Sequence, residues 1–264
     1  MAEGKMKRDT IYTLLSIPFF FLFWELFYYA VVGNPLLLAP PSKVLPVFAE
    51  LMTGGNPRFF MPLDIVYSLF HYAYGFSLAF LTGFSLGVII GWFRLADRIS
   101  YPTVELIRPI PPIAWIPIAI LLLKLTHTAA AFIIFIGAFF PVLLNTQHGV
   151  KSVEKRHVEA AMTLGAVKSL VLMRKVIIPA SMPSVITGVR VGSGIAWMCV
   201  VAAELFGVAP YGLGYQIEMA RLYHSPEIVI AYMLAIGILG LLLDRGYRLI
   251  ENRLLAWRVG LVAT

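Results

Sequence analysis

The sequence predicts an all-α membrane protein with about six transmembrane helices. Apolar residues make up 59% of its 264 residues and charged residues only 13%, and the mean hydropathy is +0.83, which exceeds what a soluble domain of this size carries. The apolar residues form runs long enough to cross a bilayer, and the Lys and Arg residues lie mainly in the connectors between those runs.

Six apolar runs approach the roughly 20 residues that a helix needs to cross about 30 Å of hydrocarbon. The predicted spans are residues 11–32, 65–93, 109–125, 128–144, 184–206 and 228–249. The first run is predicted to be an anchor and not a cleaved signal, because its core is bulky, contains Glu25 and has no small-residue cleavage site after it. An even number of spans places both ends of the chain on one side of the membrane.

The Lys and Arg residues predict which side that is. With a cytoplasmic amino terminus, 15 of the 21 fall on the cytoplasmic face: Lys5, Lys7, Arg8, Arg94, Arg98, Lys151, Lys155, Arg156, Lys168, Arg174, Lys175, Arg245, Arg248, Arg253 and Arg258. The opposite face then holds Lys43, Arg58, Lys124 and Arg221, while Arg108 and Arg190 lie at span edges. This excess follows the positive-inside rule, and its spread over several connectors argues against nucleic-acid binding. We therefore expect a cytoplasmic segment over residues 1–10, one transmembrane domain over 11–250 and a cytoplasmic tail over 251–264.

The second and fifth spans carry small residues four apart. The second contains Gly75, Ala79, Gly83, Gly87 and Gly91, and the fifth contains Gly188, Gly192 and Ala196. Because no hydrophobic force drives helices together in lipid, small residues at this spacing mark places where backbones meet. We expect packing surfaces here, either inside one chain or across a dimer.

The third span begins with the segment RPIPPIAWIP, in which Pro109, Pro111, Pro112 and Pro117 delay a regular helix. One interpretation is a kinked first turn. The other is an irregular segment that lines a solute path or hinges a gate, because irregular backbone at membrane depth persists only where it is buried in protein or wet.

Glu204 is the main candidate for a role inside a span, because ionisable groups there are costly. It could act in a translocation path or gate, together with Ser193, Trp197 and Met198 on the same predicted helix. Alternatively, its carboxylate braces the outer loop that contains the sequence Gly-Leu-Gly at residues 212–214.

Enzymatic chemistry has no support in the sequence. The five histidines are scattered without metal-ligand spacing, and the single cysteine, Cys199, provides neither a disulfide nor a thiolate site. No converging nucleophile and base can be identified, and no phosphate loop of the form G-x-x-x-x-G-K-[ST] occurs. We expect no metal, no catalytic site and no cofactor bound by this chain.

The long connector over residues 148–183 contains the sequence VEAAMTLGAVKSLVLMRKVIIPA. Ala160 and Ala161 give a short helix a low profile that a partner's groove can admit, and Gly165 permits a sharp change of direction after it. This stretch resembles the cytoplasmic signature of binding-protein-dependent transporter permeases, which reads Glu-Ala-Ala, three residues, Gly, and an apolar run closing in Pro. Glu159 and Pro179 stand at its two ends here, with one residue more between Gly165 and Pro179 than the family pattern has.

Further motifs extend the resemblance over about residues 68–257. They are RPIPPIAWIP, FFPVLLNTQHGV, the Glu of VVAAELFG, the Gly-Leu-Gly sequence and the tail IENRLLAW. In this order they are similar to permeases for aliphatic sulfonates, taurine, nitrate and bicarbonate, and to relatives for pyrimidine precursors. Two departures are the sequence LLLKLTH, where the family has an aromatic-Gly ending, and His71-Tyr72, where members often carry Arg.

The resemblance implies the permease fold of a type I ABC importer in the inner membrane of a prokaryote. It implies a homodimer docked on two cytoplasmic ATPase subunits, which hold ATP and Mg, and served by an extracytoplasmic solute-binding protein. The implied ATPase contacts are Glu159, Ala160, Ala161, Leu164 and Gly165. ATP binding would push the two Glu159 helices together and shift the bundle from inward-open to outward-open.

The implied cargo is a small anion such as a sulfonate, taurine, nitrate or bicarbonate, with a pyrimidine or other vitamin precursor as the alternative. Two other classes compete with the importer, a membrane-embedded enzyme and a passive channel. An enzyme would need the catalytic groups that the sequence lacks, and a channel would need no docking helix for an ATPase.

Overall fold

The computed structural model describes residues 2–166 and 168–255, with side chains described from residue 15 onward. Every regular element in this part of the chain is a helix, as predicted. The elements are α1 (Ala2–Phe27), η1 (Tyr28–Val32), α2 (Pro41–Thr53), α3 (Met61–Trp92), α4 (Arg94–Ile107), η2 (Pro112–Trp115), α5 (Ile116–Leu123), α6 (His127–Lys151), α7 (Lys155–Thr163), α8 (Ser169–Leu172), η3 (Met173–Ile177), α9 (Ile178–Leu205), α10 (Leu213–Leu222) and α11 (Pro226–Leu254). The expectations for the side chains of Lys5, Lys7 and Arg8, and for Trp257 and Arg258, lie outside the described residues.

Five segments within the described residues are long and apolar enough to cross a membrane. They are Leu15–Val32, Met61–Trp92, His127–Lys151, Ser169–Leu205 and Pro226–Leu254. Each contains or overlaps one of the predicted spans. The third and fourth are longer than expected, and α7 therefore lies in a shorter connector than the predicted 148–183.

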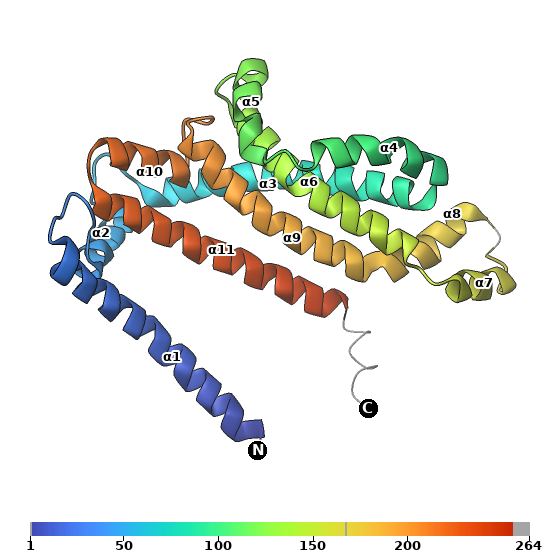
Figure 1. Ribbon diagram of the computed structural model, residues 1–264, viewed down its shortest axis with the longest axis horizontal. Helices are drawn as coiled ribbons and strands as arrows, with labels where there is room; N and C mark the ends of the chain where they lie inside the picture. The colour runs from blue at the N-terminus through green and yellow to red at the C-terminus, as the bar shows by residue number, and fades with distance from the viewer. Residues whose placement is uncertain (1, 167, 256–264) are drawn as a thin grey trace.

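The third span differs from the prediction. The predicted run 109–125 contains only η2 and the eight-residue helix α5, which is too short to cross a bilayer by itself. It forms a sixth candidate span only together with α4, and the two helices meet at an angle of 87°. The run 109–125 therefore does not cross a bilayer by itself, and Pro109, Pro111 and Pro112 interrupt the backbone between α4 and α5, in the segment where a delayed helix was expected. In Figure 1, α5 points away from the long axis of the bundle.

Helix α6 forms the centre of the bundle and packs against α3 on one side and α9 on the other. The largest cluster of buried apolar residues combines side chains from these three helices with others from α2, α10 and α11 (Figure 1). Helix α1 lies at the edge of this core, because only 6% of the residues in the apolar segment Leu15–Val32 are buried within the chain. Its exposed Phe and Leu side chains are suited to lipid.

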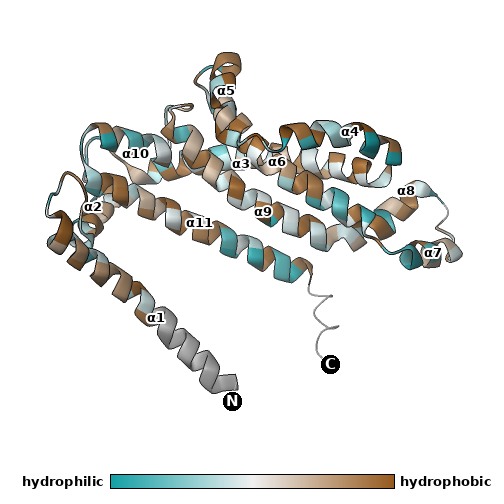
Figure 2. Cartoon of the chain, viewed as in Figure 1, coloured by the Kyte–Doolittle hydropathy of each residue, from teal (hydrophilic) through white to brown (hydrophobic). Residues whose placement is uncertain are grey.

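The two ends of the bundle differ in composition. Helices α2 and α10 lie at one end and α7 and α8 at the other, here called the α10 end and the α7 end (Figure 1). Polar residues cover α7 and the carboxyl-terminal half of α11, while α1 and α5 are largely hydrophobic (Figure 2). The start of α1 and the end of α11 both lie away from α2 and α10 (Figure 1), as an even number of crossings requires.

Three features were not predicted. The short helices α2 and α10 flank the spans at the α10 end. Arg190, expected at a span edge, instead lies well inside α9. Its position is stabilised by α11, because Arg190 Nε lies 3.3 Å from Asp244 Oδ1 and Arg190 Nη1 lies 3.3 Å from Glu251 Oε2.

Candidate functional site

Helix α7 projects from the α7 end of the bundle and carries the Glu-Ala-Ala sequence. It ends in a Schellman motif, in which the N–H of Gly165 donates to the Met162 carbonyl at 3.0 Å and the N–H of Ala166 to the Ala161 carbonyl at 3.0 Å. Gly165 has φ +90° and a side chain there would meet nothing within 4 Å. The glycine is therefore required by backbone conformation and not by lack of space.

Helix α7 is largely polar, but it and its following turn also expose apolar side chains. Glu159 and Ala160 are exposed, Leu164 is 88% exposed, and Leu170, just after the turn, is 75% exposed. Ala161 is half-buried. A leucine as exposed as Leu164, outside the candidate spans, is suited to contact with another protein.

The base of α7 is fixed to the bundle. Val158 and Met173 pack against a small buried cluster of Val88, Val150 and Ile177, which come from α3, α6 and η3. A force on α7 would therefore be transmitted to the central helices of the bundle through direct contact.

Glu204 lies at the other end of the molecule, fully buried near the end of α9. Its Oε2 accepts a hydrogen bond from Ser68 Oγ at 2.8 Å and from the N–H of Gly214 at 3.0 Å. Its Oε1 lies 2.8 Å from His71 Nδ1. Ser68 in turn accepts from the N–H of Leu213 at 2.9 Å. The carboxylate thus joins α3 to the first turn of α10.

The buried carboxylate of Glu204 explains why glycine is needed at both ends of the Gly-Leu-Gly sequence. Gly212 has φ +123°, and a Cβ on it would collide with the carboxylate of Glu204. A Cβ on Gly214 would lie 2.6 Å from the Val201 carbonyl oxygen and 2.9 Å from Glu204 Cβ. Both glycines let the backbone approach a buried carboxylate, an arrangement in keeping with the bracing role considered for Glu204.

Sequence reasoning missed the two histidines of this network. His71 is fully buried, and its Nε2 lies 2.8 Å from His127 Nδ1 at the start of α6. In the tautomer that carries its proton on Nδ1, His71 donates to the Glu204 carboxylate. The three side chains form a row and do not surround a common point, and among the described residues no group of His, Cys, Asp or Glu is arranged to hold a metal ion.

The other residues proposed with Glu204 are not gathered beside it. Ser193 and Trp197 are buried on the same side of α9, where Ser193 Oγ donates to the Arg190 carbonyl at 3.0 Å and Trp197 Nε1 to the Ile236 carbonyl at 3.2 Å. Met198 faces away and is 74% exposed. Helical spacing therefore splits this group between two surfaces.

The small residues spaced four apart on α3 and α9 pack within the chain. A Cβ at Gly75 would lie 2.6 Å from the Ala131 carbonyl oxygen, and one at Gly87 would lie 2.6 Å from Thr146 Cβ. Gly83 and Gly91 meet α6 in the same way, and Gly188 and Gly192 meet it from α9. Helix α6 is thus held closely between two helices whose small residues face it.

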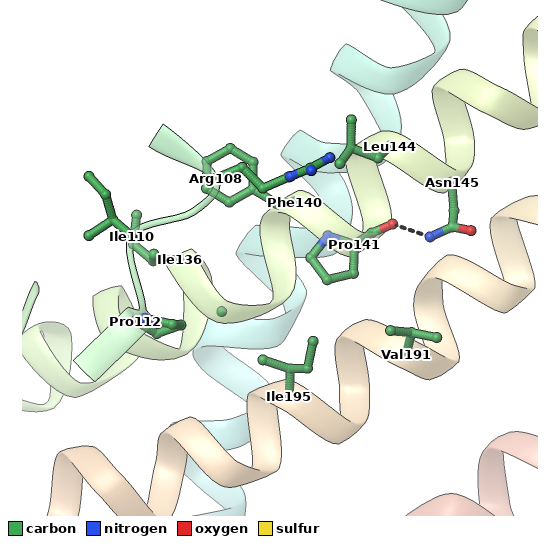
Figure 3. A pocket seen from close by; sticks show the side chains of 11 residues that line it. Arg108, Ile110, Pro112, Ile136, Phe140, Pro141, Leu144, Asn145, Val191 and Ile195 are labelled. Atoms are coloured by element: carbon green, nitrogen blue, oxygen red, sulfur yellow. Dashed lines mark hydrogen bonds between the residues drawn. The ribbon is translucent and has the colours of Figure 1, made fainter. Parts of the chain in front are cut away.

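A cleft of about 340 Å³ opens where the third span is broken. Figure 3 shows its lining side chains, which come from the break, from α6 and from α9. Nine of the lining residues are apolar or glycine, and two are polar, Arg108 and Asn145. Arg108 was expected at a span edge and instead occupies the junction between α4 and η2. The segment RPIPP is therefore irregular backbone beside a cleft, one of the two arrangements considered for it.

A second groove shares the α9 residues Val191 and Ile195 with this cleft and contains Thr187, Arg190, Gly194, Met198, Asp244 and Glu251. Its cation is fully paired, because Arg190 contacts both Asp244 and Glu251, and Asp244 also accepts from Arg248 Nε at 2.8 Å. Charge in this groove is balanced locally.

Outside the spans, α10 carries an exposed ion pair. Arg221 Nε donates to Glu218 Oε2 at 2.8 Å, and this hydrogen bond lowers the pKa of the Glu218 carboxyl. An exposed pair of this kind adds little stability.

Comparison with known proteins adds independent evidence. Residues 79–256 match the family of binding-protein-dependent transport system inner membrane components. A putative ABC transporter permease of Methanocaldococcus jannaschii is 41% identical over 96% of this chain and 95% of its own length. The taurine transport system permease of Escherichia coli is 34% identical over 85% of this chain and 81% of its own length.

A bicarbonate transport system permease of Synechococcus elongatus is 37% identical over 93% of this chain and 90% of its own length. Among solved structures, a chain of the MetNI methionine ABC transporter in inward-facing conformations shares the fold, with a TM-score of 0.63 and 18% identity. The match covers 72% of this chain and 94% of that one.

Proposed function

The chain belongs to the family of binding-protein-dependent transport system inner membrane components, and from this membership we propose that it forms the path by which a small anion enters the cytoplasm. It is a multi-pass ABC transporter permease. ATP hydrolysis takes place on a separate subunit that holds ATP and Mg, while this chain binds no nucleotide, metal or other cofactor and has no catalytic site.

The anionic cargo is supported by the relatives. One is named for taurine, whose acidic group is a sulfonate, and another for bicarbonate. Both cover most of this chain at more than 30% identity. A pyrimidine or other vitamin precursor is the alternative within the same family.

Helix α7 carries the proposal of ATP coupling. Its exposed Ala160 and Leu164 offer a small apolar surface, and Gly165 turns the chain back toward the bundle. Glu159, Ala160, Ala161, Leu164 and Gly165 are the proposed contacts with the ATPase. Closing of the ATPase subunits on ATP would displace α7, and its base at Val158 would pass that displacement to α3, α6 and η3.

The proposed assembly contains two copies of this permease, two ATPase subunits and an extracytoplasmic solute-binding protein. The α7 end faces the cytoplasm, with the amino-terminal segment and the carboxyl-terminal tail, in the inner membrane of a prokaryote. The cations of the connectors support this orientation, because Arg94, Lys151 and Arg174 belong to the α7 end.

The test is ATP-driven uptake in vesicles that contain the permease, its ATPase and its binding protein. Radiolabelled taurine and bicarbonate are supplied separately. Glu159→Trp and Gly165→Trp should abolish uptake and the ATP hydrolysis that the loaded binding protein stimulates, while the chain still enters the membrane. Ile250→Trp is the matched control, because Ile250 is also exposed and lies on α11 away from α7.

Unchanged coupling in both α7 variants would refute the docking role of this helix. Uptake that continues without any ATPase subunit would favour a passive channel instead.

A further inference from the structure

The cleft at the broken third span contains one cation, and its surroundings do not neutralise it fully. Arg108 is the only ionisable residue among those that line the cleft. Its one ion pair among the described residues is with Glu105, one turn earlier on α4, where Arg108 Nη1 lies 3.3 Å from Oε1. A guanidinium has five N–H donors, so most remain available.

Arg108 follows the last residue of α4, at the break in the third span, and about half of its side chain is exposed. Helix α4 starts at Arg94 and its 14 residues rise about 21 Å along the helix before Arg108 is reached. A cation held this far along a span faces the bundle interior or a water-filled cavity, and such residues mark solute paths. In Figure 3 the Arg108 side chain extends toward Leu144 on the wall of the cleft.

The cleft also has the composition of a small-molecule site. Its volume of about 340 Å³ lies at the lower end of the range of ligand pockets, about 300–1,000 Å³. Its walls are mostly apolar with few polar groups, as in such pockets. Asn145 uses one amide N–H to donate to the Pro141 carbonyl at 2.8 Å, which leaves its second N–H available.

The arginine in the neighbouring groove is more fully paired than Arg108. Its cation, Arg190, lies 3.3 Å from each of two carboxylates, those of Asp244 and Glu251. Arg108 has only one acidic neighbour, and about half of each partner's side chain is exposed. Of these two guanidinium groups, Arg108 is the one that has capacity for an added anion.

We propose that this cleft holds the small anionic solute during its passage, with the Arg108 guanidinium as the positive ligand. The proposal rests on the proposed function and names the solute contact within it. The planar fork of donors matches the paired oxygens of a sulfonate, a carboxylate or bicarbonate. The apolar walls formed by Ile136, Leu144 and Ile195 enclose the rest of a small solute.

The test measures the reactivity of one introduced thiol in vesicles that contain the assembled transporter. Cys199→Ala removes the only native thiol, and Leu144→Cys places one in the cleft. Two reagents of similar size are compared, the anionic sulfonatoethyl and the cationic trimethylammonioethyl methanethiosulfonate. Arg108→Gln should lower the ratio of anionic to cationic rates by about tenfold or more, the lower end of the effect of charge in a low-dielectric cleft.

Met198→Cys is the matched control, because Met198 lies in the neighbouring groove and not in the cleft. Its rate ratio should not change on Arg108→Gln. The neutral reagent methyl methanethiosulfonate should label Leu144→Cys equally with Arg108 or Gln, which shows that the cleft keeps its shape.

Occupancy is tested by protection. Millimolar taurine or bicarbonate should slow labelling of Leu144→Cys by the anionic reagent, and this protection should be lost in Arg108→Gln and weakened in Arg108→Lys, which keeps the charge but not the fork. A rate ratio unaffected by Arg108→Gln, or a thiol that no reagent reaches, overturns the proposal. Protection that follows phosphatidylglycerol content and not added solute also overturns it, in favour of a lipid headgroup.

Labelling requires no transport. Loss of ATP-driven uptake with an intact charge ratio would count against the importer function alone, and intact uptake without a charge ratio would count against the Arg108 site alone.

Discussion

His71 Nδ1 lies 2.8 Å from Glu204 Oε1, and both side chains are completely buried. Through this contact, α3 meets the end of α9, and His71 Nε2 extends the network to His127 at the start of α6. The N–H of Gly214 completes it from the first turn of α10. One carboxylate therefore joins four segments at the α10 end, and we propose that Glu204 braces this end of the molecule.

Glu204→Ala should destabilise the protein strongly. It leaves the donors of Ser68, His71 and Gly214 buried without their acceptor, and each orphaned buried donor costs about 1–3 kcal/mol. Thermal unfolding of the purified protein in detergent measures the loss. Glu105→Ala is the control, since Glu105 forms a half-exposed pair that is expected to contribute about 0–1 kcal/mol. Equal melting temperatures for the two variants would contradict the bracing role.

Alanine at either glycine of the Gly-Leu-Gly sequence should also lower stability. The cause would be steric overlap of the added Cβ with α9, and not the loss of a hydrogen bond. A Cβ at Gly214 would lie 2.6 Å from the backbone oxygen of Val201, which cannot move aside without moving α9. The expected cost is about 1–3 kcal/mol, the usual range for overpacking. Gly237→Ala on α11 serves as the control, because nothing lies within 4 Å of a Cβ there, and alanine in a helix is favoured over glycine by about 1 kcal/mol. A melting temperature that rises in all three variants would show that the loop does not lie against Glu204.

The fold class could be predicted from the sequence because bilayer thickness sets a minimum length for apolar runs, and this signal requires no knowledge of tertiary contacts. The part that α4 takes in the third span was not predicted, because α4 carries charges, among them Arg94, Asp97 and Arg98, that exclude it from an apolar run. Helices α2 and α10 were missed for a similar reason, since they are short and lie beside the spans without forming one.

The candidate sites also differ in how far they could be predicted from the sequence. The sequence Glu-Ala-Ala before Gly165 is local, so the position of α7 in a connector was visible in the sequence. Glu204 was identified because a carboxylate inside an apolar run is unusual. Its partners Ser68 and His71 are more than 130 positions away in the chain, and only their three-residue spacing on one helix face gave a signal.

Larger residues in place of the α3 glycines that face α6 should push α3 and α6 apart. A Cβ at Gly87 would lie 2.6 Å from Thr146 Cβ and 2.8 Å from the Leu143 carbonyl oxygen, so Gly87→Val should force the helices apart at their closest approach. Gly246→Val on α11 is the matched control, because its Cβ would meet nothing within 4 Å. Thermal unfolding should show a loss of at least about 1 kcal/mol for Gly87→Val relative to the control. Equal stability would mean that the two helices do not approach as closely as described.

Gly165 offers a test in which backbone conformation and steric overlap are separated. Its φ of +90° lies in the left-handed region, and a Cβ there would meet nothing within 4 Å, so any effect of a small substituent arises from the backbone. Asn adopts this region more readily than Ala, and Val adopts it least. Solute uptake per ATP hydrolysed in the reconstituted transporter should therefore fall in the order Gly, Asn, Ala, Val. Crosslinking of a thiol introduced by Leu164→Cys in the Cys199→Ala background to the ATPase should fall in the same order, because the Schellman turn sets where Leu164 points. If Asn and Val behave alike, the turn after α7 does not control the contact with the motor, and the coupling role would have to reside elsewhere on the chain.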